Sequence, residues 1–315
     1  MTVLSVVIVS YNNFATTTGP CLASLRQDDT DMEIIVVDNG SDATTRRGLI
    51  EAVNRDSRIR LLLNRTNLGY AGGTNAGADV AASDLLLLLN SDTRVLPAIT
   101  IPRLVKLMEE HPDWSMLGPV SNQVGNDQQI YTRGGKVREI MVEGAKWCAH
   151  SLGYFYPTDI LSFCCVLIRT DFYWELDGLD ESFGLGYYED TDFNYRAAAK
   201  GATLMITEDA FVYHRGSGSF DAASPEVQAM VKENRKLFRK KHGHGITAAH
   251  WRDKNLAAMR RYLERADDLI RLDLVYRFRN REKLAWQLMP NSPLKKLLYV
   301  GRLRRVIRDF RKRFA

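Results

Sequence analysis

LLLLLNSD, residues 85–92, decides the fold that we expect for this 315-residue chain, because five leucines in a row end in three polar residues. Residues 4–9, 33–37 and 59–63 are also short and largely apolar without interruption. Continuous rather than alternating apolarity is typical of strands that are covered on both faces, as in a parallel sheet. We therefore expect the first half of the chain to form such a sheet.

The segments between these strands have helical patterns, at residues 20–27, 44–54, 73–82 and 97–110. Pro97 suits a first helical position, where its missing N–H would have no partner anyway. Alternating strands and helices predict an α/β fold with a doubly wound sheet. Polar residues follow the strands at 10–13, 38–42 and 90–93, and the carboxyl ends of such strands are where open α/β sheets bind ligands.

The second half is less regular. We expect a hairpin region at 128–142, a buried strand at 161–168, a helix at 188–200 that opens with acids, and two short strands at 204–207 and 210–213. After residue 224 the pattern is helical and increasingly charged. This places a domain boundary there, with residues 1–223 as an α/β unit (halves about 1–120 and 121–223) and residues 224–315 as a helical, basic C-terminal extension.

Charge is spread unevenly along the chain. The net charge is +5, but residues 252–315 hold 19 Lys and Arg against 7 Asp and Glu. The last helix repeats apolar residues at spacings of three and four: Tyr299, Leu303, Val306, Ile307, Phe310 and Phe314. An amphipathic basic helix of this kind predicts docking on an anionic membrane surface. The alternatives are packing on its own domain or on a second subunit of a homodimer, and we do not expect nucleic acid as a partner.

The expected location is the cytoplasm, peripheral to the inner face of the cell membrane. No run of about 18 apolar residues exists to span a bilayer, and the first residues lack the basic region of a signal peptide. The cysteines, at 21, 148, 164 and 165, have no zinc-site spacing, and no base lies beside the adjacent pair. We expect reduced, buried and chemically inert thiols.

Six stretches carry the candidate chemistry: VIVSYNN (7–13), IIVVDNGSD (34–42), NLGYAGGTNAG (67–77), LLLLLNSD (85–92), GLDESFGLGYYEDTDFNYR (178–196) and FVYHRGSGSF (211–220). In this order and spacing they resemble the family 2 glycosyltransferases of the GT-A fold, over about residues 3–220. The resemblance implies a mixed, mostly parallel sheet and an inverting enzyme that moves a sugar from a UDP- or dTDP-sugar to an acceptor hydroxyl. It also implies a rhamnosyltransferase-like role in bacterial cell-surface polysaccharide assembly, such as O-antigen or capsule, with a lipid-linked or growing saccharide as acceptor.

The resemblance implies a nucleotide-sugar site in the first half. Asp38 would bind the ribose or base, although an Asx-type turn is the alternative for this residue. Glycines after residue 67 let the backbone approach a ligand, or simply pack a helix closely on the sheet. The full set expected to bind the donor is Ser10, Tyr11, Asn12, Asp38, Asn67, Gly69, Gly73, Asn75, Asn90 and Ser91.

The resemblance also implies a divalent cation, Mg²⁺ or Mn²⁺, held by Asp92 and His214. Asn90-Ser91-Asp92 occupies the place of the family's Asp-x-Asp motif, with Asn instead of the first acid. One carboxylate together with donor phosphates can hold such a cation, and an imidazole ligand favours Mn²⁺. A structural role is the alternative for His214.

Glu189-Asp190-Thr191-Asp192 is the sharpest signal. The resemblance makes Asp190 the catalytic base, which takes the proton of the acceptor hydroxyl. Glu189 and Asp192 share one helix face, and we expect them to bind the acceptor together with Trp147 and Tyr188. The alternatives are an acidic first turn favoured by the helix dipole and core packing of the aromatic side chains.

Two rival functions remain open. A sugar-phosphate nucleotidyltransferase also uses a doubly wound sheet, but it needs a basic glycine-rich loop after the first strand, and here that loop is YNNFATTTGP. A catalytically inactive scaffold with the tail as its working part is the other rival. The presence of Asp38, Asp92 and Asp190 together argues against it.

Overall fold

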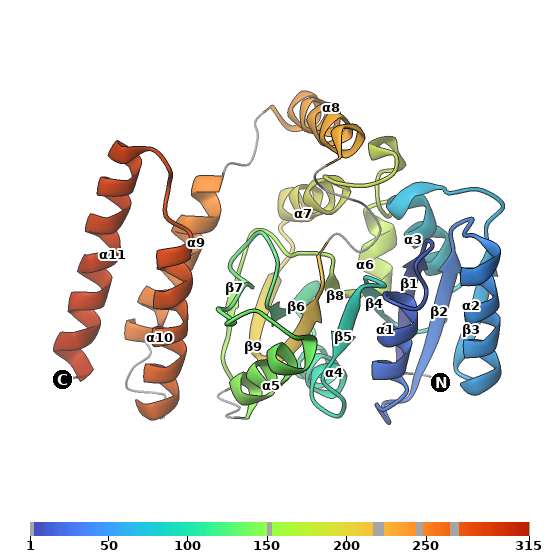
Figure 1. Cartoon of the computed structure of the whole chain (residues 1–315), viewed down its shortest axis with the longest axis horizontal. Coiled ribbons are helices and arrows are strands. Elements are labelled where there is room, and N and C mark those ends of the chain that lie inside the picture. Colours follow the sequence, from blue (N-terminus) through green and yellow to red (C-terminus); the bar gives the residue numbers. More distant parts are fainter. Residues whose placement is uncertain (1–2, 150–152, 217–223, 244–247, 265–270, 315) are drawn as a thin grey trace.

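A mixed sheet forms the centre of the computed structural model, which describes residues 3–149, 153–216, 224–243, 248–264 and 271–314. The strands are ordered β3-β2-β1-β4-β8-β6-β9-β5, and β7 pairs with β9 (Figure 1). Their bounds are β1 Leu4–Ser10, β2 Met32–Asp38, β3 Ile59–Leu63, β4 Leu85–Leu89, β5 Thr93–Val95, β6 Met116–Ser121, β7 Phe155–Pro157, β8 Cys165–Arg169 and β9 Leu204–His214.

Helices surround this sheet and form the C-terminal extension. Their bounds are α1 Thr18–Leu25, α2 Ala43–Arg55, α3 Gly69–Asp79, α4 Thr100–Glu110, α5 Val137–Cys148, α6 Thr170–Glu175, η1 Glu181–Phe183, α7 Glu189–Ala199, α8 Pro225–His242, α9 Ala248–Glu264, α10 Arg271–Gln287 and α11 Pro293–Phe314. The expected α/β fold with a helical C-terminal extension is confirmed.

The sheet is mostly parallel and is buried on both faces. β1, β2, β3, β4, β6 and β9 run in one direction, and β5, β7 and β8 run in the other. Successive residues of a strand enter different cores: Val6 and Ile8 pack with α1, α2 and α4, whereas Val7 packs with α3 on the opposite face. Because both faces need apolar side chains, the strands are continuously apolar in sequence.

The strand order reverses beside β1, and this reversal positions the candidate site. The chain builds outward from β1 to β2 and β3, and then crosses back through α3 to place β4 on the other side of β1. The carboxyl ends of β1 and β4 therefore diverge into a crevice, which is where doubly wound sheets bind ligands.

Three expectations for local structure were wrong. The helix expected from residue 97 begins at Thr100, because Ala98 has φ +56° and Pro97 lies in the preceding turn. The expected hairpin gives way to α5, whose buried residues recur at helical spacing: Ile140, Gly144, Trp147 and Cys148. The two short strands expected between 204 and 213 are one strand, β9, with a bulge after Thr207.

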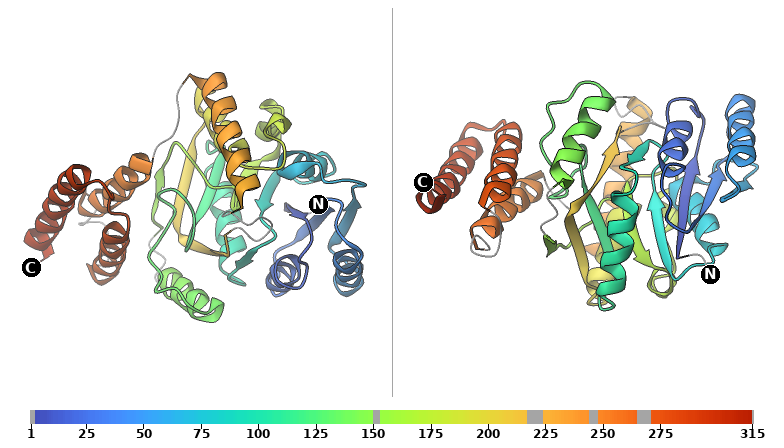
Figure 2. Two further views of the ribbon diagram at one scale, coloured as in Figure 1. Left: turned by 45° about the horizontal axis from the view of Figure 1, so that its top comes forward. Right: turned by 90° about the horizontal axis from the view of Figure 1, so that it is seen from below.

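The bulge in β9 ties the extension to the sheet through buried charges. Glu208, which is fully buried, accepts hydrogen bonds from Tyr262 at 2.6 Å, Arg277 at 3.0 Å and Arg281 at 2.8 Å. Arg281 also donates to the backbone carbonyl of Asp127 at 2.6 Å. The extension therefore shares a core with the α/β unit, and Figure 2 shows α9–α11 gathered at the end of the molecule away from the N-terminal strands.

The apolar stripe of the last helix is covered by the chain's own helices. Five of its six residues, from Tyr299 to Phe310, are buried on α11. The Phe310 ring stacks on Phe278 of α10 with centroids 3.7 Å apart, and the Tyr299 hydroxyl donates to the carbonyl of Ala285 at 3.1 Å. The expectation that this stripe faces a membrane was wrong, because packing on α9 and α10 already buries it.

The cysteines follow the sequence-based expectation. All four thiols are free and buried, and burial raises the pKa of Cys21, Cys148 and Cys164 to about 12. Within the described ranges, no helix is long and apolar enough to cross a membrane.

Replacing Glu208 by Gln should strongly destabilise the protein, because it removes the carboxylate that pairs with the buried Arg277 and Arg281. Arg277 would keep its longer pair with Asp209, at 3.4 Å. We expect a loss of about 3–5 kcal/mol in the free energy of unfolding, measured by urea denaturation. The matched control is Asp253→Asn, which breaks the half-exposed Arg302–Asp253 pair and should cost less than about 1 kcal/mol. Similar losses in the two variants would contradict a shared buried network.

Candidate functional site

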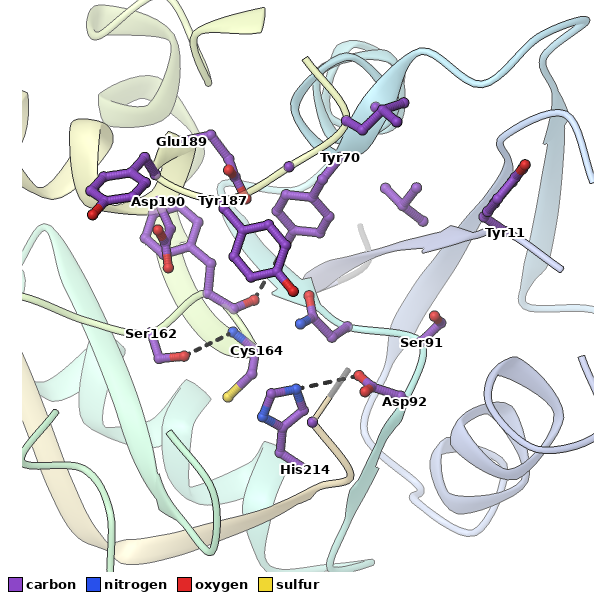
Figure 3. Close-up of a pocket in the computed structure, with 18 of the residues that line it drawn as sticks. Tyr11, Tyr70, Ser91, Asp92, Ser162, Cys164, Tyr187, Glu189, Asp190 and His214 are labelled. Atoms are coloured by element: carbon purple, nitrogen blue, oxygen red, sulfur yellow. Dashed lines mark hydrogen bonds and ion pairs between the residues drawn. The ribbon is translucent and has the colours of Figure 1, made fainter. Parts of the chain in front are cut away.

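One cavity of about 550 Å³ lies at the crevice between β1 and β4. The side expected to bind the donor, called the donor side below, is built by the ends of these strands and the start of α3. Residues 185–191 build the opposite side (Figure 3). Ten of the residues singled out in the sequence line it: Tyr11, Asn67, Gly69, Asn90, Ser91, Asp92, Tyr188, Glu189, Asp190 and His214. Residues from five distant stretches thus share one cavity.

Asp92 and His214 face each other at one wall of the cavity. His214 Nε2 lies 3.4 Å from Asp92 Oδ1, and His214 Nδ1 lies 2.7 Å from the carbonyl oxygen of Gln123. Nδ1 must therefore carry the proton, because a carbonyl only accepts. Burial alone would lower the pKa of His214, but the bonds to Asp92 and Gln123 outweigh it and raise that pKa.

These residues fit a divalent cation that is shared with a bound phosphate. A metal-binding histidine commonly donates its other ring N–H to a carbonyl, as His214 does to Gln123. Asn90 Oδ1, beside Asp92 in sequence, is buried without a hydrogen-bond partner in the described structure. Among the described residues, no three His, Cys, Asp or Glu gather to hold a metal. Two protein ligands therefore leave coordination positions for phosphate oxygens.

Amide side chains form part of the donor side. Asn39, at the end of β2, donates to Asn67 Oδ1 at 2.8 Å and to the carbonyl of Gly69 at 2.9 Å. Asp38 is fully buried behind this wall and does not line the cavity. It accepts from Ser41 N, three residues on, at 3.1 Å and from Arg46 Nε at 2.9 Å, so its carboxylate stabilises the local turn.

Four other predicted donor residues lie outside the cavity lining. The Ser10 hydroxyl bonds Thr18, and Asn12 accepts from the Asp42 backbone. Gly73 packs against Val9, where a Cβ would approach within 2.9 Å. Asn75 donates to the carbonyl of Leu179 at 2.9 Å, across to the other half of the site. These residues shape the wall from behind: Ser10, Asn12, Gly73 and Asn75.

Glu189 and Asp190 open α7 on the side of the cavity opposite Asp92 and His214 (Figure 3). Burial, and then the neighbouring Asp190, raises the pKa of Glu189 to about 8. Burial also raises the pKa of Asp190, although hydrogen bonds from Thr191 N at 2.6 Å and from the Thr191 hydroxyl oppose this. A buried carboxylate with a raised pKa is a stronger base than a solvated one.

Asp192 and Trp147 do not line the cavity, contrary to the acceptor-binding role expected for them. Asp192 is fully buried and bonds Arg196 Nε at 2.7 Å and His242 Nε2 at 2.7 Å. Trp147 is buried in the core, where its Nε1 donates to the carbonyl of Glu208 at 2.7 Å. Asp192 lies almost one helical turn beyond Glu189, where His242 and Lys241 of α8 cover its carboxylate. The core needs the large apolar ring of Trp147.

Further lining residues were not among the predicted site residues, and they include Asn39, Tyr70, Gln123 and Ser162. Asn39 and Tyr70 lie inside stretches already singled out, so their motifs were the available signal. The Tyr70 hydroxyl donates to the carbonyl of Phe163 at 3.2 Å and so joins the two sides of the cavity. Gln123 follows β6, a strand not anticipated from its sequence. Residues 217–220 of the FVYHRGSGSF stretch lie outside the described residues.

The sequence profile of glycosyl transferase family 2 matches residues 5–176, and the chain belongs to this family. An N-acetylglucosaminyl-diphospho-decaprenol L-rhamnosyltransferase of Mycobacterium tuberculosis is 26% identical over 69% of this chain and 77% of its own length. An uncharacterized glycosyltransferase of Nostoc sp. is 25% identical over 64% of this chain and 68% of its own length. An uncharacterized protein of Sinorhizobium fredii is 24% identical over 59% of this chain, which spans only 21% of that protein.

Solved structures share the fold. A crystal structure of GalNAc-T7 with UDP, GalNAc and Mn²⁺ has a TM-score of 0.55 at 18% identity, covering 76% of this chain and 51% of that chain. A crystal structure of S. aureus TarS 1–349 has a TM-score of 0.52 at 17% identity, covering 92% of this chain and 93% of that chain. At this level of identity the similarity concerns the fold alone.

Glu189→Gln should reduce the loss of stability that the protein undergoes as the pH rises. The folded state keeps the Glu189 proton up to about pH 8, whereas the unfolded chain releases it near pH 4.3. Glu189 therefore lowers the free energy of unfolding progressively between these pH values. We would measure the free energy of unfolding by urea denaturation at pH 5 and at pH 8. It should fall between these pH values by at least about 1 kcal/mol less in the variant than in the wild type.

The control is Glu110→Gln on the exposed end of α4, which should leave the pH dependence unchanged. An identical pH dependence in wild type and Glu189→Gln would show that Glu189 is ionised in the folded protein at neutral pH.

Proposed function

We propose that this chain transfers a sugar from a UDP- or dTDP-sugar to an acceptor hydroxyl, with inversion at the anomeric carbon. The observation that carries the proposal is the placement of two residue pairs on opposite sides of one cavity. Asp92 and His214 lie on one side, and Glu189 and Asp190 lie on the other. One pair suits a diphosphate with its cation, and the other suits a hydroxyl that must lose a proton. Membership of glycosyl transferase family 2 supports the same reaction class.

The donor side has the size and chemistry for a nucleotide sugar. The cavity volume of about 550 Å³ lies within the range of small-molecule sites. Tyr11 supplies a ring on which a base can stack, and Asn67 and Ser91 supply polar groups for ribose and phosphate oxygens. Asp38 would act on the ribose or base only after exchanging its bond with Arg46 for one with the ligand.

Asp92 and His214, with Asn90 beside them, would hold a divalent cation, Mg²⁺ or Mn²⁺. Bound there, it supplies positive charge to the diphosphate as that group leaves. His214 is already oriented for this role by its bond to Gln123. The His214 imidazole favours Mn²⁺ among the two.

Asp190 then acts as the general base. The acceptor hydroxyl gives its proton to the Asp190 carboxylate while its oxygen attacks the anomeric carbon. The bond from that carbon to the diphosphate breaks, and the nucleoside diphosphate leaves with the electron pair. A single in-line displacement inverts the anomeric configuration. Tyr188 and Glu189 line the cavity beside Asp190 and would orient the acceptor.

For the acceptor we propose a lipid-linked or growing saccharide in bacterial cell-surface polysaccharide assembly, such as O-antigen or capsule. Two relatives support this class. One is the mycobacterial rhamnosyltransferase named for an N-acetylglucosaminyl-diphospho-decaprenol. The other is an undecaprenyl-phosphate 4-deoxy-4-formamido-L-arabinose transferase of Proteus mirabilis, 36% identical over 29% of this chain.

A lipid-linked acceptor calls for a membrane-facing surface, and we propose that α11 provides it on the cytoplasmic face of the cell membrane. Leu294, Leu297 and Leu298 form one helix face and are 62–71% exposed. This is a different face from the buried stripe described above. α11 carries nine Lys and Arg and one acid, Asp309, so its charge complements an anionic bilayer rather than another copy of the same helix.

Asp190→Asn should abolish sugar transfer without loss of nucleotide binding. Loss of a general base costs about 10²–10⁴-fold in rate. We would measure transfer from a panel of UDP- and dTDP-sugars to N-acetylglucosamine diphosphate carried on a short alkyl chain. Binding of UDP and dTDP would be measured by calorimetry and should stay within about twofold, because the carboxyl becomes an amide of equal size.

The matched control for this experiment is Asp79→Asn at the exposed end of α3, which should transfer at the wild-type rate. Wild-type turnover by Asp190→Asn would remove Asp190 from the role of base. Failure of the wild type to use any donor of the panel would support the inactive-scaffold alternative.

Replacing Leu297 and Leu298 by Asn should release the protein from anionic vesicles. Each leucine that enters the lipid contributes about 1.5–3 kcal/mol, so the double variant should bind at least about tenfold more weakly. Sedimentation with vesicles of equal phosphatidylglycerol and phosphatidylcholine measures the bound fraction, which should also fall as salt is added.

The control replaces two exposed apolar residues elsewhere, Ile50 and Leu63, by Asn, and should bind like the wild type. Unchanged binding of the Leu297 and Leu298 variant would refute this surface. A change in oligomeric mass in place of vesicle binding would identify a second copy as its partner.

A further inference from the structure

The loop at residues 184–188 has a strained backbone where it lines the cavity. Tyr187 and Tyr188 have φ of +69° and +79°, although side chains rarely adopt this left-handed conformation. Gly184 and Gly186 also have positive φ, at +67° and +155°. Such a backbone persists only where its surroundings over-determine it, so contacts from outside the loop must hold it in place.

Asn234 of α8 supplies such contacts. Its Nδ2 lies 2.8 Å from the carbonyl oxygen of Phe183, 2.8 Å from that of Gly186 and 3.0 Å from that of Tyr187. The Asn234 side chain is 8% exposed. A carbonyl only accepts and an amide NH₂ has two hydrogens, so three carbonyls converge on one donor group. They converge only while the loop keeps its observed path.

Three further contacts hold α8 over the loop and over the start of α7. The fully buried Phe238 ring lies 5.5 Å from the Tyr188 ring, between centroids. Asp192 of α7 accepts from Lys241 at 2.7 Å and His242 at 2.7 Å, both on α8. Figure 1 shows α8 next to α7, at the top of the view. α8 therefore contacts the loop and the helix that carries Asp190 at the same time.

We propose that Asn234 is a positioning residue for the acceptor, because it fixes the 184–188 loop and thereby the Tyr187 and Tyr188 side chains beside Asp190. The inference rests on the proposed function, in which the acceptor enters on the Asp190 side. Both tyrosines line the cavity, whereas Asn234 does not. α8 also lies outside residues 5–176, which the family profile matches, so this device belongs to the later part of the chain.

The loop also contacts the donor side of the cavity, and this contact limits which part of the loop the loss of Asn234 should disturb. The backbone N–H of Tyr70 donates to the carbonyl of Leu185 at 3.2 Å, so one end of the loop is also held by α3. A Cβ on Gly69 would lie 2.0 Å from the carbonyl oxygen of Gly184, which shows how closely α3 and the loop approach. Loss of the Asn234 contacts should therefore disturb the loop at Tyr187 and Tyr188 and leave the donor side of the cavity intact.

Asn234→Asp tests this inference, because Asp has the size of Asn but places a carboxylate against three carbonyls. Backbone amides at 184–192 should exchange with deuterium at least about tenfold faster. With N-acetylglucosamine diphosphate on an alkyl chain as acceptor, kcat/KM should fall about 10–100-fold, mainly through a higher acceptor KM. The Kd of UDP or dTDP should stay within about twofold, as in the Asp190→Asn experiment.

The matched control is Asn280→Asp. Asn280 also donates from an extension helix to a backbone carbonyl, that of Tyr131 at 2.7 Å, but Tyr131 does not line the cavity. This variant should leave exchange at 184–192 and the acceptor KM unchanged. If Asn234→Asp does not fold, Asn234→Ala removes the donor without adding a charge and should show the same two effects.

The outcomes separate this inference from the proposed function. Unchanged exchange at 184–192 would overturn the role of Asn234, and so would faster exchange with an unchanged acceptor KM. If the wild type transfers no sugar, the proposed function fails, and the exchange measurement still decides whether Asn234 holds the loop. Equal effects of Asn234→Asp and Asn280→Asp would show that general stability, and not positioning, explains the loss.

Discussion

The pairing of Thr93 with His214 between antiparallel β5 and β9 is the constraint on which the candidate site depends. It brings Asp92, which directly precedes β5, next to His214 at the end of β9. The backbone N–H of Arg215 also donates to the carbonyl of Asp92 at 3.1 Å. Without this short ladder, the acid and the imidazole would lie on unconnected loops, and no pair would face the cavity.

The opposite wall is held by direct bonds between the two halves rather than by the sheet. Asn75 of α3 accepts from the Tyr173 hydroxyl at 2.6 Å and from Leu179 N at 2.9 Å. These contacts fix the approach of α6 and η1 to the donor side. Polar groups that are held in this way before a ligand binds need little reorganisation during a reaction.

The sheet was predictable because its strands are buried on both faces, which makes LLLLLNSD and its counterparts conspicuous. Asp92, Asp190 and His214 were also found from their motifs, and the structure brings them to one cavity. The ends of strands fix only the backbone, however, and they do not say which neighbouring side chain points inward. Asn39 lines the cavity while Asp38 turns to Arg46, and nothing in IIVVDNGSD distinguishes the two.

Long-range packing was the other limit. The stripe on α11 was recognised correctly as apolar, but the sequence of one helix does not name the surface that covers it. Trp147 was misplaced for a related reason, since an aromatic residue near a site serves equally well in the core. Asn234 had no signal in the sequence, because its partners are backbone carbonyls, which every residue carries.

The buried charges around Glu208 constrain the evolution of this chain. The extension cannot be exchanged for the C-terminal helices of a relative as if it were a separate module. A transplanted segment without arginines at the positions of Arg277 and Arg281 would leave Glu208 in the core without these counter-charges. Recombination within the family would have to carry the β9 bulge and the extension together as one inherited unit.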